Sequence, residues 1–256
     1  MAPEAYAFTE GLTFIFPPET LPATALADES TPAGQIWATT LKTYLELDQV
    51  GTVYWAVLPE ASQTTKLLIE WKTSAAHDEF NASPESSALR KSWDSIIAQP
   101  VKNTIYEWGT PGVRRQTALG SDHNTVSCLF TWTFRDGSTP NQEQWEAAFH
   151  PFSKAMMSSP VGGIYSYCTH GWQLNATPAS YTAAYHTHSM ESTKEWLATA
   201  EVQTLLERIV SEGGAMDLKV EYMEMKVYAC GWCGSVMRIY PEIPNEANFL
   251  ARLRGG

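Results

Sequence analysis

The feature that most constrains this sequence is an internal repeat, because short segments of the second half resemble segments of the first in the same order. The offset between matching segments rises along the chain from 108 to 111, 116 and 117 residues, as small insertions in loops would require. A duplication accounts for this pattern. The matching pairs are Thr31–Trp37 with Thr139–Trp145, Val50–Tyr54 with Val161–Tyr165, Trp71–Phe80 with Thr187–Trp196, and Ile105–Trp108 with Tyr222–Met225.

Periodicity predicts the same elements in both halves. Apolar stripes at helical spacing begin at Trp37, Leu89, Trp145 and Val202. Ser83 followed by Pro84 marks a helix start, because serine caps helices and proline is favoured at the first helical position. Each half therefore has the order β-α-β-β-α-β, the ferredoxin-like arrangement. The β-rich runs lie at 12–16, 52–58, 65–72, 102–108, 126–134, 162–170, 180–188 and 218–228.

These elements divide the chain into parts. We expect a first ferredoxin-like repeat at 1–110, a second at 125–229 and a glycine- and proline-containing connector at 111–124. Residues 230–256 extend beyond the second repeat and are expected to form a C-terminal strap across the surface. Residues 17–31 are expected to be a mobile surface loop.

One stretch carries a family resemblance. Trp71-x-Thr73-x-x-x-His77-x-x-Phe80-x-x-Ser83-Pro84 resembles the end of the third strand and the start of the following helix in antibiotic-biosynthesis-monooxygenase-like proteins. These proteins belong to the dimeric α+β barrel superfamily, which two tandem βαββαβ units also resemble. The motif covers about 14 residues. The second half departs from it, since the corresponding places hold Thr187, Thr193 and Trp196.

The resemblance implies an α+β fold in which two tandem ferredoxin-like βαββαβ repeats form an intramolecular dimeric α+β barrel. Such a chain would be a monomeric pseudo-dimer or a weak homodimer. The superfamily includes cofactor-free monooxygenases, polyketide cyclases, dehydratases, muconolactone isomerases and haem enzymes, so the fold implies no single reaction. In these folds the pocket usually lies between the sheet and its helices, one per repeat.

Charge and composition exclude several classes of partner. The formal net charge is −11, which would repel a phosphate backbone, so nucleic acid is not an expected partner. No apolar run reaches the length of about 18 residues that a membrane span needs, and residues 1–12 show no signal peptide. Four cysteines do not make a disulfide framework in a chain of this size, so we expect a reducing, cytoplasmic compartment.

The strongest catalytic candidates are His186 and His188. On one strand, side chains two residues apart share a face, and histidine is the natural acid or base near neutral pH. Tyr165 and Tyr167 alternate in the same way nearby and could orient or protonate a substrate oxygen. If matching residues of the two halves are 116 positions apart, His186 corresponds to Glu70, and its side chain would face the barrel lumen or the interface between the repeats. One extra residue in the turn of the second half would place it on the opposite face of the sheet.

Aromatic side chains supply the expected substrate pocket. Trp55, Trp71 and Trp132 are placed on strands, where a large ring belongs either to the core or to a pocket wall. Phe149 and His150 on the second-half helix complete the predicted substrate-binding set. His77 and His150 are predicted to lie on helices, where a histidine is more often exposed to solvent or hydrogen-bonded within the protein than catalytic.

No cofactor or metal is predicted. Two histidines without a third ligand are a weak metal signal, and no specific haem motif is present. Dinucleotide-binding, Walker A and nucleophile-elbow patterns are missing from the sequence. Cys230-x-x-Cys233 has the spacing of a redox pair, but a turn in the strap is the simpler interpretation. Cys128 and Cys168 are expected to be buried as small hydrophobic residues.

The predicted function is a cofactor-independent enzyme of secondary metabolism, with its reactive pocket in the C-terminal half. It would catalyse cyclisation, dehydration or isomerisation of a hydrophobic, aromatic or polyketide-like small molecule by histidine and tyrosine acid–base chemistry. One alternative is a cofactor-free monooxygenase of the same superfamily. Another is a small-molecule-binding protein without catalytic activity.

Overall fold

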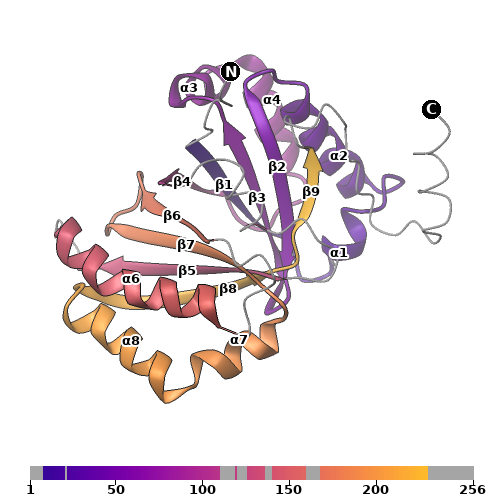
Figure 1. Cartoon of the computed structure of the whole chain (residues 1–256). Coiled ribbons are helices and arrows are strands. Elements are labelled where there is room, and N and C mark those ends of the chain that lie inside the picture. Colours follow the sequence, from indigo (N-terminus) through magenta and orange to yellow (C-terminus); the bar gives the residue numbers. More distant parts are fainter. Residues whose placement is uncertain are drawn as a thin grey trace, which may run out of the picture.

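The computed structural model describes residues 8–20, 22–109, 119, 126–135, 140–159 and 168–229, and the side chains up to residue 225. The first half contains four strands and four helices, in an order that begins and ends with a strand (Figure 1). These elements are β1 (Phe8–Ile15), α1 (Pro22–Ala25), α2 (Pro32–Leu45), β2 (Val50–Leu58), β3 (Ala61–Trp71), α3 (Ser74–Asn81), α4 (Pro84–Trp93) and β4 (Lys102–Trp108).

The described part of the second half follows the same order, except that α6 alone stands where the first half has α1 and α2, and it adds one short strand. Its elements are β5 (Val126–Phe134), α6 (Gln142–Ser158), β6 (Cys168–Gln173), β7 (Ser180–Thr187), α7 (Met190–Leu197), α8 (Ala200–Ser211), β8 (Ala215–Met223) and β9 (Lys226–Ala229). None of the helices in the described ranges is long and apolar enough to cross a membrane.

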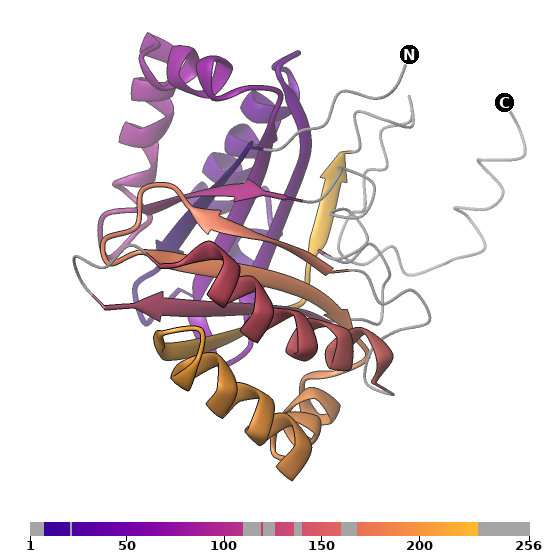
Figure 2. The same ribbon diagram turned by 60° about the vertical axis from the view of Figure 1, so that its left-hand side comes forward.

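All the strands belong to one antiparallel sheet, ordered β8-β5-β7-β6-β4-β1-β3-β2-β9. The β4–β6 pair joins the two halves, and the sheet curls so that its two ends approach each other (Figure 2). β8 lies at one end of the sheet and β9 at the other, although only residues 224 and 225 separate them in the chain. The chain itself therefore connects the two ends of the curled sheet.

Strand register places the halves in correspondence. Thr9 pairs with Glu70 and Tyr106, whereas Ser127 pairs with His186 and Met223, so these residues occupy matching sheet positions. The helix caps after the third strands, Thr73 and Ser189, are also 116 residues apart. The alternative register for His186, with an extra residue in the turn, is therefore wrong, because cap and strand keep the same spacing in both halves.

Alternating side chains divide the sheet into an outer face that carries the helices and an inner face. Two aromatic cores fill the outer side, one around Trp37 and Trp55 and the other around Trp132 and Trp145. A third core lies on the inner face and combines both halves. Its buried members are Tyr54, Ala56, Leu58, Leu68, Tyr106, Trp108, Leu119, Leu129, Ala184 and Met223.

The structure corrects several predicted boundaries. β1 starts at Phe8 rather than residue 12, because a carboxylate and a glycine in FTEGLTFI obscure its alternation. The segment predicted to be a loop at 17–31 contains the short helix α1. The predicted strand at 218–228 is two strands, since β8 leaves the sheet at Met223 and β9 pairs with β2 instead. The strap at 230–256 lies outside the described residues.

The joint between the halves depends on Gly171. A Cβ added there would lie 1.8 Å from the Glu107 carbonyl oxygen, in backbone that cannot move without breaking the β4–β6 pair. We expect Gly171→Ala to lower the free energy of unfolding by about 1–3 kcal/mol. Gly109→Ala is the matched control, because its Cβ would lie 3.7 Å from the His170 carbonyl oxygen, an ordinary contact. Urea unfolding of both variants measures the difference, and equal stabilities would contradict this role for Gly171.

Candidate functional site

A buried carboxylate lies between the sheet and the helices of the first half. Leu12 and Phe14 of β1 face the aromatic core, and Glu10 continues the same face. The Glu10 side chain is fully buried. Because burying an isolated carboxylate is costly, such a group needs hydrogen bonds or cations around it. Its Oε1 atom accepts a hydrogen bond of 2.7 Å from the Asn103 amide on β4.

The first basic side chain beside this carboxylate is His77. Thr73 caps α3 by accepting a hydrogen bond from the Ala76 amide, which starts the helix directly after β3 and places His77 in its first turns. The His77 Nε2 atom lies 3.5 Å from Glu10 Oε1, and its Nδ1 atom lies 3.0 Å from a carboxylate oxygen of Asp78. The ring also contacts an indole, with the centroids of His77 and Trp71 5.6 Å apart.

The pKa of His77 is raised from its ordinary value. Burial alone would lower this pKa, but the hydrogen bonds and charges of Glu10 and Asp78 outweigh burial. The charges of Glu10 and Asp78 therefore favour the imidazolium form of this side chain. A protonated His77 can donate a proton or stabilise a neighbouring anion.

The second basic side chain is Arg90 of α4. Its guanidinium lies 3.6 Å from Glu10 Oε1 and donates to the amide oxygen of Asn81 at 2.5 Å. The Asn81 amide nitrogen lies 2.7 Å from His77 Nε2 and donates to it when the imidazole is neutral with its proton on Nδ1, so one amide contacts both basic side chains. Arg90 is 39% exposed, unlike Glu10 and His77. It therefore connects the buried carboxylate to solvent.

One oxygen of the buried carboxylate has no hydrogen-bond donor. Glu10 Oε2 is buried, and no partner for it is present among the residues the structure describes. Glu10 also contributes to raising the pKa of Tyr44 well above its ordinary range, after the larger effect of burial. An unsatisfied buried acceptor is costly, so this atom marks a place where a bound O–H or N–H group would gain a hydrogen bond.

The matching positions of the second half lack this charge arrangement. Cys128, Thr193 and Leu206 stand where the first half has Glu10, His77 and Arg90. The Cys128 sulfur lies 3.4 Å from the Thr187 hydroxyl, and burial raises the pKa of this thiol to about 11. Cys128 is therefore a neutral thiol, and the carboxylate–imidazole–guanidinium cluster is specific to the first half. Cys128 and Cys168 are both buried, as predicted.

His186 and His188, which are predicted to act together, lie in different environments, one buried and one exposed. His186 is the penultimate residue of β7 and shares the inner face with Ala184, away from the helices. β7 ends at Thr187, and His188 lies exposed in the bend before α7. The prediction that they lie side by side on one strand is therefore wrong, because the strand stops one residue too early. Tyr165 and Tyr167 lie outside the described residues.

The predicted aromatic wall is divided between two cores. Trp55 packs against Trp37 in the first-half core, with ring centroids 5.5 Å apart. Trp132 packs against Phe149 in the second-half core at 5.4 Å. Glu10, His77 and Arg90 are called the Glu10 cluster below. Of the predicted substrate-binding residues, only Trp71 contacts this cluster, through the ring of His77. His150 is exposed on α6.

Glu10 and Arg90 were not identified from the sequence. The available signal for Glu10 was a single carboxylate in phase with Leu12 and Phe14 on an otherwise apolar strand face. For Arg90 no local signal exists, because a basic residue in the last turn of a helix is common. No group of three or more histidine, cysteine or acidic side chains within the described ranges is arranged to hold a metal ion.

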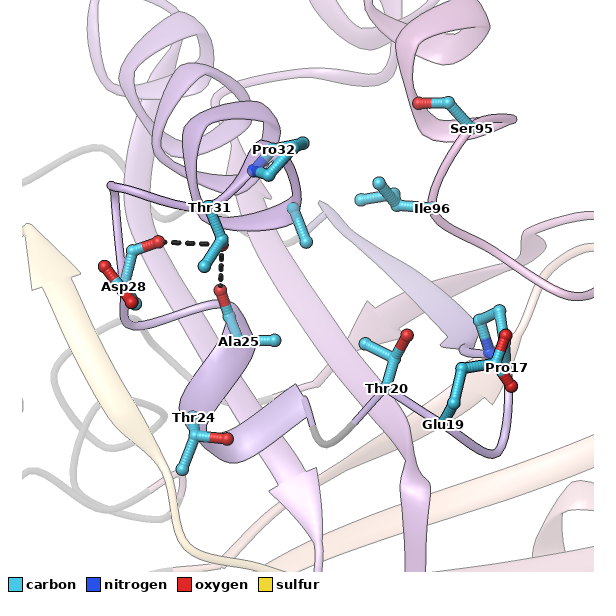
Figure 3. Close-up of a pocket in the computed structure, with 11 residues that line it drawn as sticks. Pro17, Glu19, Thr20, Thr24, Ala25, Asp28, Thr31, Pro32, Ser95 and Ile96 are labelled. Atoms are coloured by element: carbon cyan, nitrogen blue, oxygen red, sulfur yellow. Dashed lines mark hydrogen bonds between the residues drawn. The ribbon is translucent and has the colours of Figure 1, made fainter.

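A surface pocket of about 610 Å³ lies elsewhere, between the segment before α2 and the residues after α4 (Figure 3). Across the wall of this pocket, the single hydroxyl hydrogen of Thr31 is shared between the carbonyl oxygens of Ala25 and Asp28, which lie 3.0 and 2.8 Å from its oxygen. Its described lining contains hydroxyl groups and the carboxylates of Glu19 and Asp28 but no histidine, cysteine, lysine or arginine. This lining offers no cation to a carboxylate base, so the Glu10 cluster is the better candidate for catalysis.

The raised pKa of His77 predicts a pH-dependent contribution to stability. The folded state holds the proton more tightly than the unfolded chain, whose histidines titrate near about 6.5. This contribution is therefore complete below that value and is lost as the pH rises through the raised pKa. We expect the stability difference between the wild type and His77→Gln to shrink with rising pH, as measured by urea unfolding. A difference that grows with pH would contradict the assignment.

Comparisons with known proteins identify the fold. No protein-family model matches the sequence, and no curated protein matches it significantly. An anthrone oxidase-like protein aligns over 92% of this chain and 98% of its own, with 11% identity and a TM-score of 0.58. A proposed monooxygenase from Fusobacterium nucleatum aligns over 86% and 93%, with 8% identity and a TM-score of 0.56.

A third structure agrees with these two. A proposed monooxygenase from Lactobacillus acidophilus NCFM aligns over 88% of this chain and 97% of its own, with 10% identity and a TM-score of 0.54. At such low identities the likeness concerns the fold alone. The chain therefore has an α+β fold of the dimeric α+β barrel type, with one curled antiparallel sheet, as in these monooxygenase-like structures.

Proposed function

We propose that this chain is a cofactor-independent enzyme that oxidises an electron-rich hydroxyaromatic small molecule with O₂ at the Glu10 cluster. The observation that carries the proposal is the buried Glu10 Oε2 atom, to which no described residue donates, beside His77 and Arg90. A buried carboxylate with one free lone-pair site is placed to accept a proton from a substrate. The fold is shared with proteins described as monooxygenases and as anthrone oxidase-like, which makes this reaction class the one to test first.

The first steps form and trap a carbanion. Glu10 removes a proton from an activated CH₂ group of the substrate, and the resulting anion is delocalised into the aromatic rings. The charges of Arg90 and protonated His77 stabilise this anion, and their partly buried setting strengthens the effect. The anion then reduces O₂, the carbon–oxygen bond forms, and His77 donates a proton to give a hydroperoxide.

The last steps release water and restore both side chains. Neutral His77 removes the remaining C–H proton, the O–O bond breaks, and protonated Glu10 gives its proton to the departing hydroxide. The net change is CH₂ + O₂ → C=O + H₂O, so the substrate supplies all the electrons that O₂ accepts. Trp71 and Phe80 pack against each other beside His77, with ring centroids 5.6 Å apart, and would be the nearest aromatic rings to a bound substrate.

We also propose that the sheet consists of two ferredoxin-like repeats that arose by duplication. The strand orders β4-β1-β3-β2 and β8-β5-β7-β6 are the same in the two halves, which supports this origin. In this view one chain supplies what a dimer would otherwise supply from two. The chain would then be a monomer in solution, and sedimentation that shows an obligate dimer would contradict it.

An oxygen electrode tests the reaction class. The protein is treated with a chelator and mixed with a hydroxylated anthrone, and O₂ uptake and product are measured with and without air. Enzyme-dependent uptake of one O₂ per ketone formed supports the proposal. Conversion that continues without O₂ overturns it in favour of cyclisation, dehydration or isomerisation. Binding without conversion overturns it in favour of a binding protein.

A further inference from the structure

A histidine–tyrosine pair lies in the second half and has no role in the proposed reaction. His170 of β6 and Tyr181 of β7 stand on neighbouring strands, on the outer face that carries α6. The Nδ1 atom of His170 and the hydroxyl of Tyr181 are hydrogen-bonded. The matching first-half positions hold Trp55 and Thr65, so this pair occurs in one half only.

The environment keeps both partners neutral. Burial lowers the pKa of His170, while the nearby charge of Glu146 raises it and that of His150 lowers it further. Burial is also the main cause that raises the pKa of Tyr181, and the neighbouring Cys168 and Glu146 raise it further. An intact phenol therefore faces an uncharged imidazole. With the imidazole proton on Nε2, the Nδ1 atom accepts the phenolic hydrogen bond.

Large rings connect this pair to the core and to the surface. The centroid of Tyr181 lies 4.9 Å from that of Trp145, which in turn lies 5.7 Å from Trp132 in the centre of the second-half core. On its other side Tyr181 lies 4.9 Å from Trp172, which is half-buried. Tyrosine and tryptophan lose one electron more readily than aliphatic side chains do. These rings therefore form a continuous path from the core towards solvent.

We propose that Tyr181 and His170 form a redox site that accepts oxidising equivalents by proton-coupled electron transfer. An organic peroxyl radical or another one-electron oxidant takes one electron from Tyr181, directly or through Trp145. The O–H bond breaks, and the proton moves to His170 Nδ1, which leaves a neutral tyrosyl radical and an imidazolium. An external one-electron reductant, such as a thiolate, supplies an electron through Trp172, and the proton returns to the phenolic oxygen.

The proton transfer is what makes this pair suited to oxidation. Without a base, one-electron oxidation of a buried phenol would leave a cation in a medium of low polarity, which is costly. His170 removes that cost, because the positive charge moves to an imidazole that is partly exposed and lies near the carboxylate of Glu146. This site is independent of Glu10, so its test does not depend on the proposed reaction.

Flash oxidation tests the pair in the full chain. Ruthenium tris-bipyridine is photo-oxidised in the presence of persulfate, and the protein radical is followed by transient absorption and electron paramagnetic resonance. We expect a tyrosyl radical in the wild type, most of which is lost in Tyr181→Phe. Tyr222→Phe is the matched control, because Tyr222 is a buried tyrosine on β8 of the same core, and it should keep the signal. An undiminished signal in Tyr181→Phe would overturn the proposal.

The role of His170 has its own test. We expect His170→Gln to slow radical formation by about 10²-fold, since glutamine keeps a hydrogen bond but is not a proton acceptor of useful basicity. Melting curves establish that the variant is folded. If it is not, the wild type decides the question, since formation should be slower in D₂O and should fail when acid protonates His170. The absence of both effects would overturn the proposal, as would a wild-type rate in folded His170→Gln.

Discussion

Glu10→Gln is expected to lower turnover by about 10²–10⁴-fold, which is the usual contribution of a positioned general base. Glutamine has nearly the same shape and still accepts the hydrogen bond from Asn103, so the local packing is kept. It has no basic oxygen, so the substrate proton cannot be removed. O₂ uptake with the hydroxylated anthrone gives the effect on kcat, and thermal melting shows that the variant is folded.

Two further variants test whether the loss of turnover is specific to Glu10. Glu107→Gln changes an exposed glutamate on β4 and should keep wild-type turnover. His186→Gln tests the sequence-based prediction that the C-terminal half holds the acid–base group, which stays a prediction. The proposal expects normal turnover for His186→Gln, because that side chain lies on the inner face of the sheet. Full activity in Glu10→Gln together with loss in His186→Gln would move the reactive centre to the second half.

Lys66→Met is expected to lower the free energy of unfolding by about 3 kcal/mol, the lower end of the range for breaking a buried ion pair. Lys66 of β3 and Glu221 of β8 are 2.7 Å apart, and each side chain is only 9% exposed. Their ion pair joins the two halves across the interior of the curled sheet. The value lies at the lower end because Lys219, 2.9 Å from Glu221, still pairs with the remaining carboxylate.

The control pair also joins the two halves but lies at the surface. Lys194 and Glu60 are paired with 46% and 48% of their side chains exposed, so Lys194→Met should cost less than about 1 kcal/mol. Replacing both Lys66 and Glu221 by apolar residues should cost less than Lys66→Met alone, since no buried charge is then left. Urea unfolding of the three variants and the wild type gives these values. Equal costs for Lys66→Met and Lys194→Met would contradict a structural role for the interior pair.

Local features of the fold could be predicted from the sequence, since they depend on neighbouring residues. Thr31 and Ser83 cap α2 and α4 as their sequences indicate, each accepting a hydrogen bond from a backbone amide three residues on. The apolar stripe of Trp37, Leu41 and Tyr44 is buried, as helical spacing predicts. The offset of 117 between β4 and β8 agrees with the strand pairing.

The candidate site could be predicted much less well. Its members Glu10, His77 and Arg90 come from a strand and two helices, and no spacing rule connects them. His77 belongs to a sequence motif, but its place in the candidate site depends on a carboxylate 67 residues earlier in the chain. Periodicity leaves open whether Trp55, Trp71 and Trp132 belong to the core or to a pocket wall, and in the structure the aromatic rings of the helix–sheet layer mostly pack with one another rather than against the Glu10 cluster.

The sequence alone determined the order of the elements, most helix starts and the similarity of the two halves, because hydrophobic period and capping act over a few residues. The tertiary structure alone decided which face of the sheet each polar side chain occupies and which distant groups meet there. His186 faces inward because strand register places it on the same face as Ala184, and Glu10 meets Arg90 because α4 packs over β1. Strand register and helix docking bring together residues far apart in the chain, and no local pattern records those contacts.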